Sequence, residues 1–421
     1  MGKTFAEKVL GRAAGREVHP GEIVTVTPDY CLSHENAAFV SKSFYEIGVT
    51  KIFDPERLVI NFDHMVPAST ADYANTQKAV RQFVREQQLP HFYDYQNHGG
   101  ICHQIMVQEG YALPGLIIIG TDSHTCTAGA MGAFATGIGR PEMAAVWATG
   151  KIWLMVPKSI RIWLTGRLRE HVTAKDFILT LIGDLRANGA DYMSVEFDGP
   201  GLDTLSIDER MTLCNMGIEM GAKNAVCRPD EKVLAWARQQ GKRQDWQALW
   251  ADEDAVYEKV LTYDLGSIVP CVAKPHKVDN FAPVSQVWGT PIDQVFLGTC
   301  TNARMHDLRQ AAAILKGKQV AVRTIVIPAS VKIYSQLARE GLLSVFLDAG
   351  CSVGTPGCGP CIGVYGGCIG DGETVLSTAN RNFQGRNGAK SGKIYLASPV
   401  TAAYSALYGE IRNPVGFHQE V

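Results

Sequence analysis

Two cysteines three positions apart, Cys358 and Cys361, lie in the glycine-rich segment 354–363. A Cys-x-x-Cys pair suits thiol–disulfide exchange, a structural zinc site or an iron–sulfur cluster. Redox pairs usually stand near the start of a small domain, whereas this pair comes late in a chain of 421 residues. Zinc needs four ligands, and the nearby Cys351 and Cys368 form no second pair of this kind. The glycines favour a backbone that closes tightly around a bulky group.

A third thiol, Cys300, directly follows the apolar run 295–297, which predicts a buried strand. A thiol at a strand end, followed by small polar residues, can reach a ligand in a cleft. Together with Cys358 and Cys361 it would give a cluster three protein ligands and leave one iron open as a Lewis acid. The alternative is a buried thiol that serves as a small hydrophobic side chain, and the residue pattern alone leaves both open.

Histidines and carboxylates gather just after apolar, strand-like runs in the first third of the chain. Because strand ends in open α/β sheets face the ligand crevice, these side chains are candidates for one site. A carboxylate beside a histidine fixes its tautomer and stabilises its charged form, as proton transfer requires. For each pair taken alone, a hydrogen bond within a loop is the simpler alternative. The candidates are Asp63, His64, His103, Asp122, Ser123 and His124, with Asn215 and Glu219 in a later segment.

Two arginines, Arg381 and Arg386, stand five positions apart in the glycine-containing segment 380–387. Guanidinium forks bind carboxylates and phosphates, although a solvated surface pair is an equally simple interpretation. Arginines, proton-transfer groups and an open Lewis-acidic iron together favour a small polycarboxylate that undergoes acid–base chemistry. A hydroxy acid that loses or gains water would use every one of these parts.

Short apolar runs and helical patterns predict the elements that must position these residues. Buried strands are predicted at 58–60, 115–119, 295–297 and 324–327, and a strand of alternating polarity is predicted at 160–164. Helices are predicted at 72–86 and 307–315, and a polar helical stretch at 231–258. Because strands and helices alternate, the sequence predicts α/β domains with mainly parallel sheets.

Length and composition set the wider limits. A chain of 421 residues is too long to fold around one hydrophobic core. Candidate domain boundaries near residues 157 and 278 predict three α/β domains, 1–157, 158–278 and 279–421. A net charge of −2 argues against a nucleic-acid partner, which needs clustered Lys and Arg. The N-terminus lacks the apolar core of a signal peptide, and no apolar run is long enough to span a bilayer. We therefore expect a cytoplasmic protein without a membrane partner, whose 11 cysteines are reduced or ligate metal.

Seven ordered stretches give the chain a resemblance to a known family. The chain resembles the aconitase superfamily, in particular its large subunits of the 3-isopropylmalate dehydratase and homoaconitase type. The stretches are Asp63-His64 with Val66-Pro67-Ala68, Gly100 to Gln104, Gly120 to Thr125, Cys214 to Gly217 with Glu219, Cys300-Thr301-Asn302, Cys358 to Cys361, and Asn380 to Phe383 with Gly385-Arg386-Asn387.

The resemblance implies three α/β domains of the aconitase type around a [4Fe–4S] cluster, without the swivelling fourth domain of single-chain aconitases. It implies that Cys300, Cys358 and Cys361 hold this cluster and leave one iron open for the hydroxyl and a carboxylate of the substrate. The implied catalytic pairs are Asp63 with His64, Asp122 with His103, and Glu219 with His124. His64 is then the acid that protonates the departing hydroxyl, and the other histidines orient the water or hydroxyl. The implied substrate and cluster-lining contacts come from His34, Ser123, Asn215, Asn380, Arg381 and Arg386.

The resemblance also implies a partner. The chain ends at Val421, soon after the Arg386 stretch, so a separate small swivel-domain subunit is expected to supply the serine base and further arginines. The chain alone is then expected to be inactive. The expected substrate is a small dicarboxylic or tricarboxylic acid, and the expected reaction converts 3-isopropylmalate into 2-isopropylmalate by dehydration and rehydration, in leucine biosynthesis.

Several alternatives stay open. Within the same class the substrate could be homoaconitate, 2,3-dimethylmalate, or citramalate and maleate. Other classes are a thiol–disulfide oxidoreductase and an RNA-binding apo-form. Two positions depart from the family pattern: Glu35 follows His34 where Asp is usual, and Ala303 follows Asn302 where Gly is common. We expect Glu35 to reshape a substrate-side loop, and both changes to leave the cluster untouched.

Overall fold

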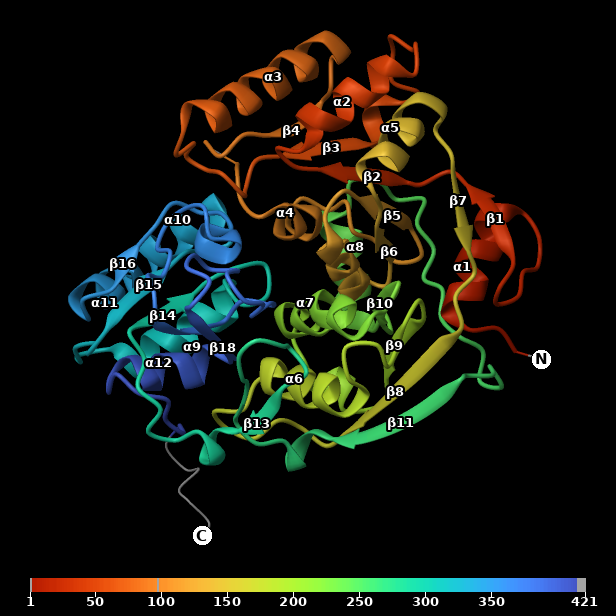
Figure 1. Ribbon diagram of the computed structural model, residues 1–421. Helices are drawn as coiled ribbons and strands as arrows, with labels where there is room; N and C mark the ends of the chain where they lie inside the picture. Colours follow the sequence, from red (N-terminus) through yellow and green to blue (C-terminus); the bar gives the residue numbers. More distant parts are fainter. Residues whose placement is uncertain (1, 97, 415–421) are drawn as a thin grey trace.

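The computed structural model describes residues 2–96 and 98–414. They form three units, each a β-sheet with its helices, arranged around a common centre (Figure 1). Each of these units is called a layer. The upper layer in Figure 1 is a five-stranded sheet of order β4-β3-β2-β5-β6, in which all neighbours run parallel. Its strands are β2 (Tyr30–Ser33), β3 (Leu58–Asn61), β4 (His91–Tyr93), β5 (Ile117–Gly120) and β6 (Phe134–Gly137). The helices of this part are α2 (Ala37–Glu46), α3 (Ala71–Gln87), α4 (Cys102–Gln108) and α5 (Arg140–Thr149).

A second, four-stranded sheet lies below the first and is also parallel throughout, in the order β10-β9-β8-β11. Its strands are β8 (Ser159–Thr165), β9 (Ser194–Asp198), β10 (Asn224–Cys227) and β11 (Lys259–Asp264). Its helices are α6 (Ala174–Leu185), α7 (Ile207–Asn215) and α8 (Glu231–Gln240). A two-stranded antiparallel ribbon of β1 (Ile23–Val26) and β7 (Ile152–Met155), with helix α1 (Phe5–Ala14), lies beside the first two sheets.

The third sheet has seven strands in the order β13-β12-β18-β17-β14-β15-β16. Strand β12 pairs antiparallel with both of its neighbours, β13 and β18, and the other described neighbours in this sheet pair parallel. The strands are β12 (Cys271–Ala273), β13 (Phe281–Pro283), β14 (Gln294–Leu297), β15 (Arg323–Val326), β16 (Ser352–Val353), β17 (Thr374–Ser377) and β18 (Lys393–Ala397). The helices are α9 (Met305–Leu315), α10 (Val331–Arg339), α11 (Leu342–Asp348) and α12 (Pro399–Ala406).

The predicted fold class is confirmed at the level of elements. Mainly parallel sheets are present, and each predicted strand overlaps a strand of the structure, because short apolar runs are typical of strands buried on both faces. The predicted helices correspond to α3 and α9. The domain boundaries stay a prediction; β12, the first strand of the third sheet, precedes the proposed boundary at 278.

The polar helical stretch predicted for 231–258 is wrong beyond Gln240, where α8 ends. Gly241 leaves the helical conformation there, with a φ of −58° and a ψ of 133°. After it, Trp246 and Trp250 pack against two hydrophobic cores, and Asp252 accepts a hydrogen bond from the backbone N–H of Lys3 at 2.8 Å. These long-range contacts hold the segment in an irregular path that local helix propensity does not reveal. Among the described residues, no helix is both long and apolar enough to cross a membrane.

Candidate active site

The predicted site residues lie mostly on loops that follow the carboxyl ends of buried strands. His34 follows β2, His64 follows β3, and Asp122 follows β5 of the first sheet. Cys300 and Asn380 follow β14 and β17 of the third sheet. The carboxyl ends of parallel strands open toward ligands, so the two sheets present their loops to a shared space.

That space is a cavity of about 300 Å³ between the layers, and it collects nearly all of the predicted residues. Its predicted lining residues are His34, Asp63, His64, His103, Asp122, Ser123, His124, Cys300, Cys358, Cys361, Asn380, Arg381 and Arg386. The two remaining predicted residues, Asn215 and Glu219, lie directly behind the wall and bind lining side chains. The lining also includes Ile101, Thr121, Thr299 and Ile362, which the sequence did not single out.

The three predicted histidine–carboxylate pairs are present. His64 Nδ1 lies 2.6 Å from Asp63 Oδ1, and His103 Nε2 lies 2.8 Å from Asp122 Oδ1. His124 Nε2 lies 2.8 Å from Glu219 Oε1. Asp63 and His64 are neighbours in the sequence, whereas the other two pairs join residues from different segments. The His124–Glu219 pair forms because the 3₁₀ segment Ser123–Met131 packs against α7, whose end leads to Glu219. These two pairs are therefore tertiary contacts.

The electrostatics of the site lower the pKa of the Asp63 and Asp122 carboxyls and raise the pKa of His64 and His124. Burial disfavours charge on Asp63, but the His64 imidazolium beside it lowers the pKa of Asp63 to about 2. Burial opposes charge on His64 as well, yet the Asp63 and Asp122 carboxylates raise the pKa of His64 well above its usual value. The pKa of His124 is raised against burial by its bonds to Asp122 and Glu219. His64 thus holds a proton at neutral pH, as a general acid must.

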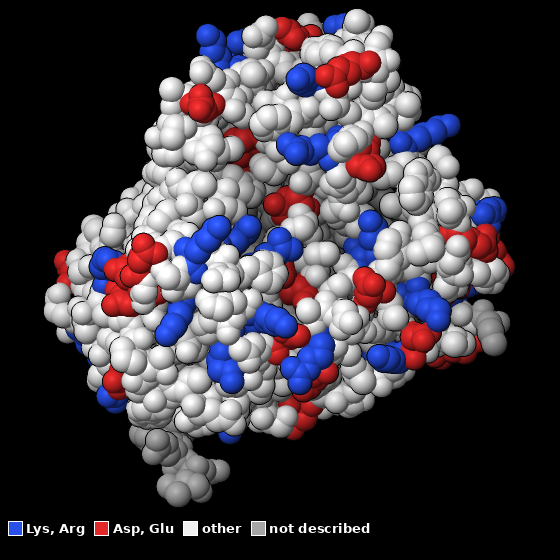
Figure 2. Space-filling view, in the orientation of Figure 1, with Lys and Arg blue, Asp and Glu red and all other residues white. Residues whose placement is uncertain are grey.

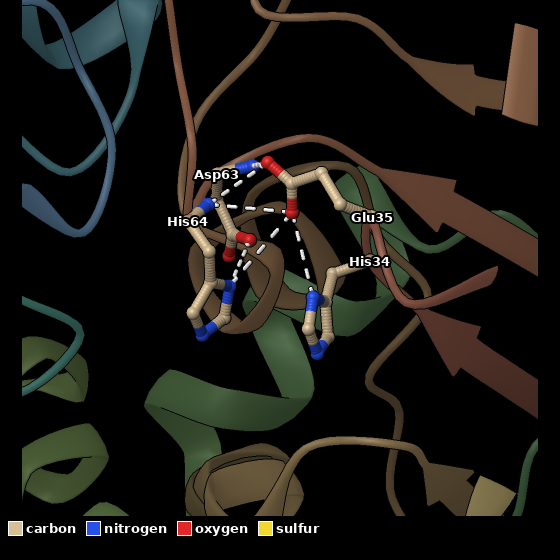
Figure 3. A group of neighbouring side chains, drawn as sticks. All are labelled: His34, Glu35, Asp63 and His64. Carbon is tan, nitrogen blue, oxygen red and sulfur yellow. Dashed lines mark hydrogen bonds and ion pairs between the residues drawn. The ribbon is translucent and has the colours of Figure 1, made fainter. Parts of the chain in front are cut away.

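Glu35 supports the loop that carries His64 (Figure 3). Its fully buried Oε1 accepts hydrogen bonds from the backbone N–H groups of Asp63, His64 and Met65, each at 3.0 Å. Its Oε2 lies 3.4 Å from Nδ1 of His34, whose ring stacks on that of His64 at 4.2 Å between centroids. The ligand atoms of these four side chains lie within 4.8 Å of one another, which is close enough to surround a cation. Because three N–H donors already occupy the Glu35 carboxylate, the arrangement is better described as a support for the His64 loop.

The three predicted cysteine ligands line the same cavity and are buried. Asn215 Nδ2 and Asn380 Nδ2 point at the Sγ atom of Cys300, at 3.1 Å and 3.3 Å. Burial raises the pKa of Cys300 to about 12. This thiol is therefore deprotonated only when a strongly positive partner, such as a metal, binds its sulfur. Amide donors directed at a ligand sulfur are typical of iron–sulfur sites. The donor set therefore fits a cluster.

The backbone around Cys358 also fits a bulky group. The N–H of Cys358 donates to the carbonyl of Asp63 at 2.8 Å, which joins the cysteine loop to the His64 loop. Gly359 has a φ of +58°, and a Cβ there would meet Ile327 Cδ1 at 2.3 Å. Glycine at this position thus lets the chain turn inward between Cys358 and Cys361.

The two predicted arginines both line the cavity. Arg381 Nε donates to Glu219 Oε1 at 2.8 Å, so Glu219 binds both Arg381 and His124. Arg386 Nη2 lies 3.9 Å from Cys361 Sγ, which brings a guanidinium next to the cysteine group. Both can turn a guanidinium edge toward an acid in the cavity.

Two features of the site escaped the sequence reading. Thr299, directly before Cys300, has a φ of +74°, which is rare for a β-branched residue and stores strain of the kind found at functional sites. The support role of Glu35 is not predicted either, because the sequence predicts only that Glu35 reshapes a substrate-side loop. The local sequence does not indicate the positive φ of Thr299 or the distant N–H groups that donate to Glu35. Ala303, the other departure, is buried and does not line the cavity.

Comparisons with known proteins agree with this geometry. The pattern of the aconitase family (aconitate hydratase) matches residues 7–291 and 285–409. A 3-isopropylmalate dehydratase large subunit from Methanopyrus kandleri is 46% identical over 417 residues, which cover 98% of this chain and 99% of that protein. A protein from Methanosarcina mazei named "Probable methanogen homoaconitase large subunit" is 50% identical over 387 residues, 92% of this chain and 98% of that protein.

Among solved structures, the holo-form of aconitase X from Thermococcus kodakaraensis is similar with a TM-score of 0.51 at 11% identity. The similarity covers 98% of this chain and 94% of that one, and at this identity it bears on the fold alone. The family pattern and the full-length relatives lead to one conclusion. The chain belongs to the aconitase family.

Proposed function

We propose that this chain is the large, cluster-binding subunit of a hydro-lyase that interconverts 3-isopropylmalate and 2-isopropylmalate by dehydration and rehydration, in leucine biosynthesis. The observation that carries the proposal is the convergence of three histidine–carboxylate pairs, three cysteines and two arginines on one cavity. The full-length relatives with this name support the choice of reaction.

Cys300, Cys358 and Cys361 would hold a [4Fe–4S] cluster in this cavity, with Asn215 and Asn380 donating to Cys300. When bound, such a cluster supplies an iron with an open coordination position, which acts as a Lewis acid toward a hydroxyl and a carboxylate.

The chain's own residues supply proton transfer and binding. His64 carries a proton at neutral pH and gives it to the hydroxyl that leaves as water; in the reverse direction it takes that proton back. Asp63 stabilises the imidazolium, and Asp122 Oδ2, 3.6 Å from His64 Nε2, limits where the ring can point. His103 and His124, each fixed by a carboxylate, orient the water. Ser123, Arg381 and Arg386 bind the carboxylates of the substrate.

Removal of the proton on carbon needs a base, and we infer that a small partner subunit provides it. The relatives are named as large subunits, which supports a two-subunit enzyme. In this proposal the small swivel-domain subunit brings a serine base and further arginines to the open side of the cavity. A cytoplasmic location remains an expectation from the sequence.

Homoaconitase is the second candidate, because a relative of that name is 50% identical. The test is to reconstitute the chain anaerobically with its cognate small subunit and compare kcat/KM for 3-isopropylmalate, homoaconitate, 2,3-dimethylmalate and citramalate. A preference for 3-isopropylmalate is expected. A preference for homoaconitate would transfer the assignment to the second candidate, and turnover of none of these acids would contradict the proposal.

The alternatives of other classes receive less support. A thiol–disulfide oxidoreductase needs an accessible thiolate, whereas Cys358 and Cys361 are buried and burial raises the pKa of Cys358 well above its usual value. An RNA-binding apo-form needs a broad basic surface. On the face drawn in Figure 2, Lys and Arg are interspersed with Asp and Glu, without a broad area of one sign.

A further inference from the structure

A fully buried lysine, Lys175, joins the second layer of the molecule to the two loops that line the cavity on the third layer. It lies in the first turn of α6, and its Nζ donates to the carbonyls of Thr378 at 2.8 Å and Ala379 at 2.7 Å. The same Nζ lies 3.3 Å from Oδ1 of Asn302. Thr378 and Ala379 immediately precede Asn380 and Arg381 in the chain, and Asn302 stands two positions after Cys300.

These three acceptors require an ammonium group. A neutral amine has two N–H groups, whereas three oxygens surround Nζ, which matches the three donors of the charged form. Burial lowers the pKa of Lys175 to about 7, and the nearby Asp307 carboxylate opposes this shift. Burying an ammonium group away from water costs free energy unless each of its N–H donors has an acceptor. The three acceptors around Lys175 Nζ meet this requirement.

The helix itself does not explain the lysine. The cap of α6 is formed by Thr173, whose hydroxyl accepts from the N–H of Lys175, and by Asp176, which completes a capping box, so the Lys175 side chain takes no part in it. A positive side chain at this end also opposes the helix dipole. The acceptors of Lys175 all lie outside α6, on the loops of the third sheet.

Asn302, one of the residues that Lys175 binds, is also hydrogen-bonded to the start of α9. Asn302 Nδ2 donates to Asp307 Oδ1 at 3.0 Å, and Asp307 Oδ2 accepts from the backbone N–H of Arg304 at 3.1 Å. The loop after Cys300 is thus held from both sides, by Lys175 on one and by the start of α9 on the other.

We propose that Lys175 is a positioning residue that fixes the loop after Cys300 relative to the loop that carries Asn380 and Arg381. It keeps the Asn380 amide directed at the Cys300 sulfur and the Arg381 guanidinium beside Glu219. The inference rests on the proposed function in so far as these loops serve a cluster and a carboxylate substrate.

The test uses Lys175→Met in the full chain, because methionine is apolar, unbranched and similar in length. Amide hydrogen exchange is measured on the anaerobically reconstituted protein and on the metal-free chain. We expect exchange in residues 299–304 and 378–382 to become about ten to a hundred times faster, as expected for the loss of hydrogen bonds to a charged donor. With the small subunit present, KM for the preferred acid should rise more than kcat falls, because Arg381 loses its position.

Arg210→Met is the matched control. Arg210 is also a fully buried cation, and its Nη2 donates to the carbonyl of Leu202 at 3.0 Å and binds Asp230, neither of which lies on a cavity loop. This variant should be destabilised to a similar degree but keep wild-type exchange in 299–304 and 378–382 and a wild-type KM. If Lys175→Met does not fold, Lys175→Gln is measured instead; its amide has two donors, so at least one of the two segments should still exchange faster.

The outcomes separate this inference from the proposed function. Unchanged exchange in both segments for the Lys175 variants would overturn the inference, even if the wild type binds iron and turns over substrate. Equal changes in Lys175→Met and Arg210→Met would overturn it too, because they would indicate general destabilisation. A wild type that takes up no iron would contradict the proposed function, while exchange in the metal-free chain would still decide whether Lys175 fixes the loops.

Discussion

At the scale of single residues, the site depends on carboxylates that hold charged histidines in a buried cavity. Asp63 and His64 have pKa shifts in opposite directions, down to about 2 and well above the usual value, as expected for an ion pair that outweighs burial. Glu35 adds a carboxylate that binds three successive N–H groups. The convergence of strand ends predicts that these histidines and carboxylates share one crevice, and the resemblance to the aconitase family implies the individual pairs. The Glu35 contacts could not be predicted, because they depend on where a neighbouring loop passes.

Replacing Asp63 should change the pH range of activity. In Asp63→Asn the negative charge beside His64 is lost, so the pKa of His64 falls. Because His64 must be protonated to donate, the descending limb of kcat/KM for dehydration should move to lower pH by about one to three units. Asp94→Asn, which breaks a partly buried pair with Arg81, serves as the control and should leave the pH dependence of kcat/KM unchanged. A limb that stays at its wild-type pH in Asp63→Asn would argue against His64 as the acid.

Replacing Cys300 should remove the cluster. In Cys300→Ser, iron bound after anaerobic reconstitution should fall far below the roughly four atoms expected for a full cluster. Cys351→Ser is the control, since Cys351 is also buried but does not line the cavity, and it should retain wild-type iron. Equal iron contents in the two variants would show that Cys300 is not a ligand, leaving it as a buried hydrophobic side chain.

At the scale of elements, parallel strands explain why residues far apart in sequence meet. The apolar runs that predict β3, β5, β14 and β15 are correct because strands buried on both faces carry a strong local signal. The polar stretch after Gln240 and the left-handed Thr299 could not be predicted, because both depend on distant contacts. Lys175 likewise gives no local signal, since its partners lie more than a hundred residues away.

The turn between Cys358 and Cys361 can be tested through its glycine. In Gly359→Ala the left-handed backbone costs about 1–2 kcal/mol, and the new methyl group collides with the buried Ile327. Iron uptake should therefore fall along with the unfolding temperature. Gly372→Ala is the control, with a φ of +76° and no neighbouring atom within 4 Å of the added methyl. It should lose some stability but bind iron normally; matching iron loss in both variants would refute the local explanation.

At the scale of the whole molecule, two of the three layers supply most of the cavity lining, and the second supplies Asn215, Glu219 and Lys175 behind it. The chain covers almost the whole length of its relatives, and those from Methanopyrus kandleri and Methanosarcina mazei are both named as large subunits. We therefore predict that the reconstituted chain alone shows no isomerisation of 3-isopropylmalate and that adding the small subunit restores it, in an assay of product formed against time. Full turnover by the chain alone would contradict the need for a partner base.

The most direct test of the central claim is the iron and acid-labile sulfide content of the anaerobically purified chain, followed by electron paramagnetic resonance after mild oxidation. We predict roughly four irons and four sulfides per chain, and a three-iron signal when the open iron is lost. Absence of iron even after anaerobic reconstitution, with a titratable dithiol at Cys358 and Cys361 instead, would contradict the hydro-lyase mechanism.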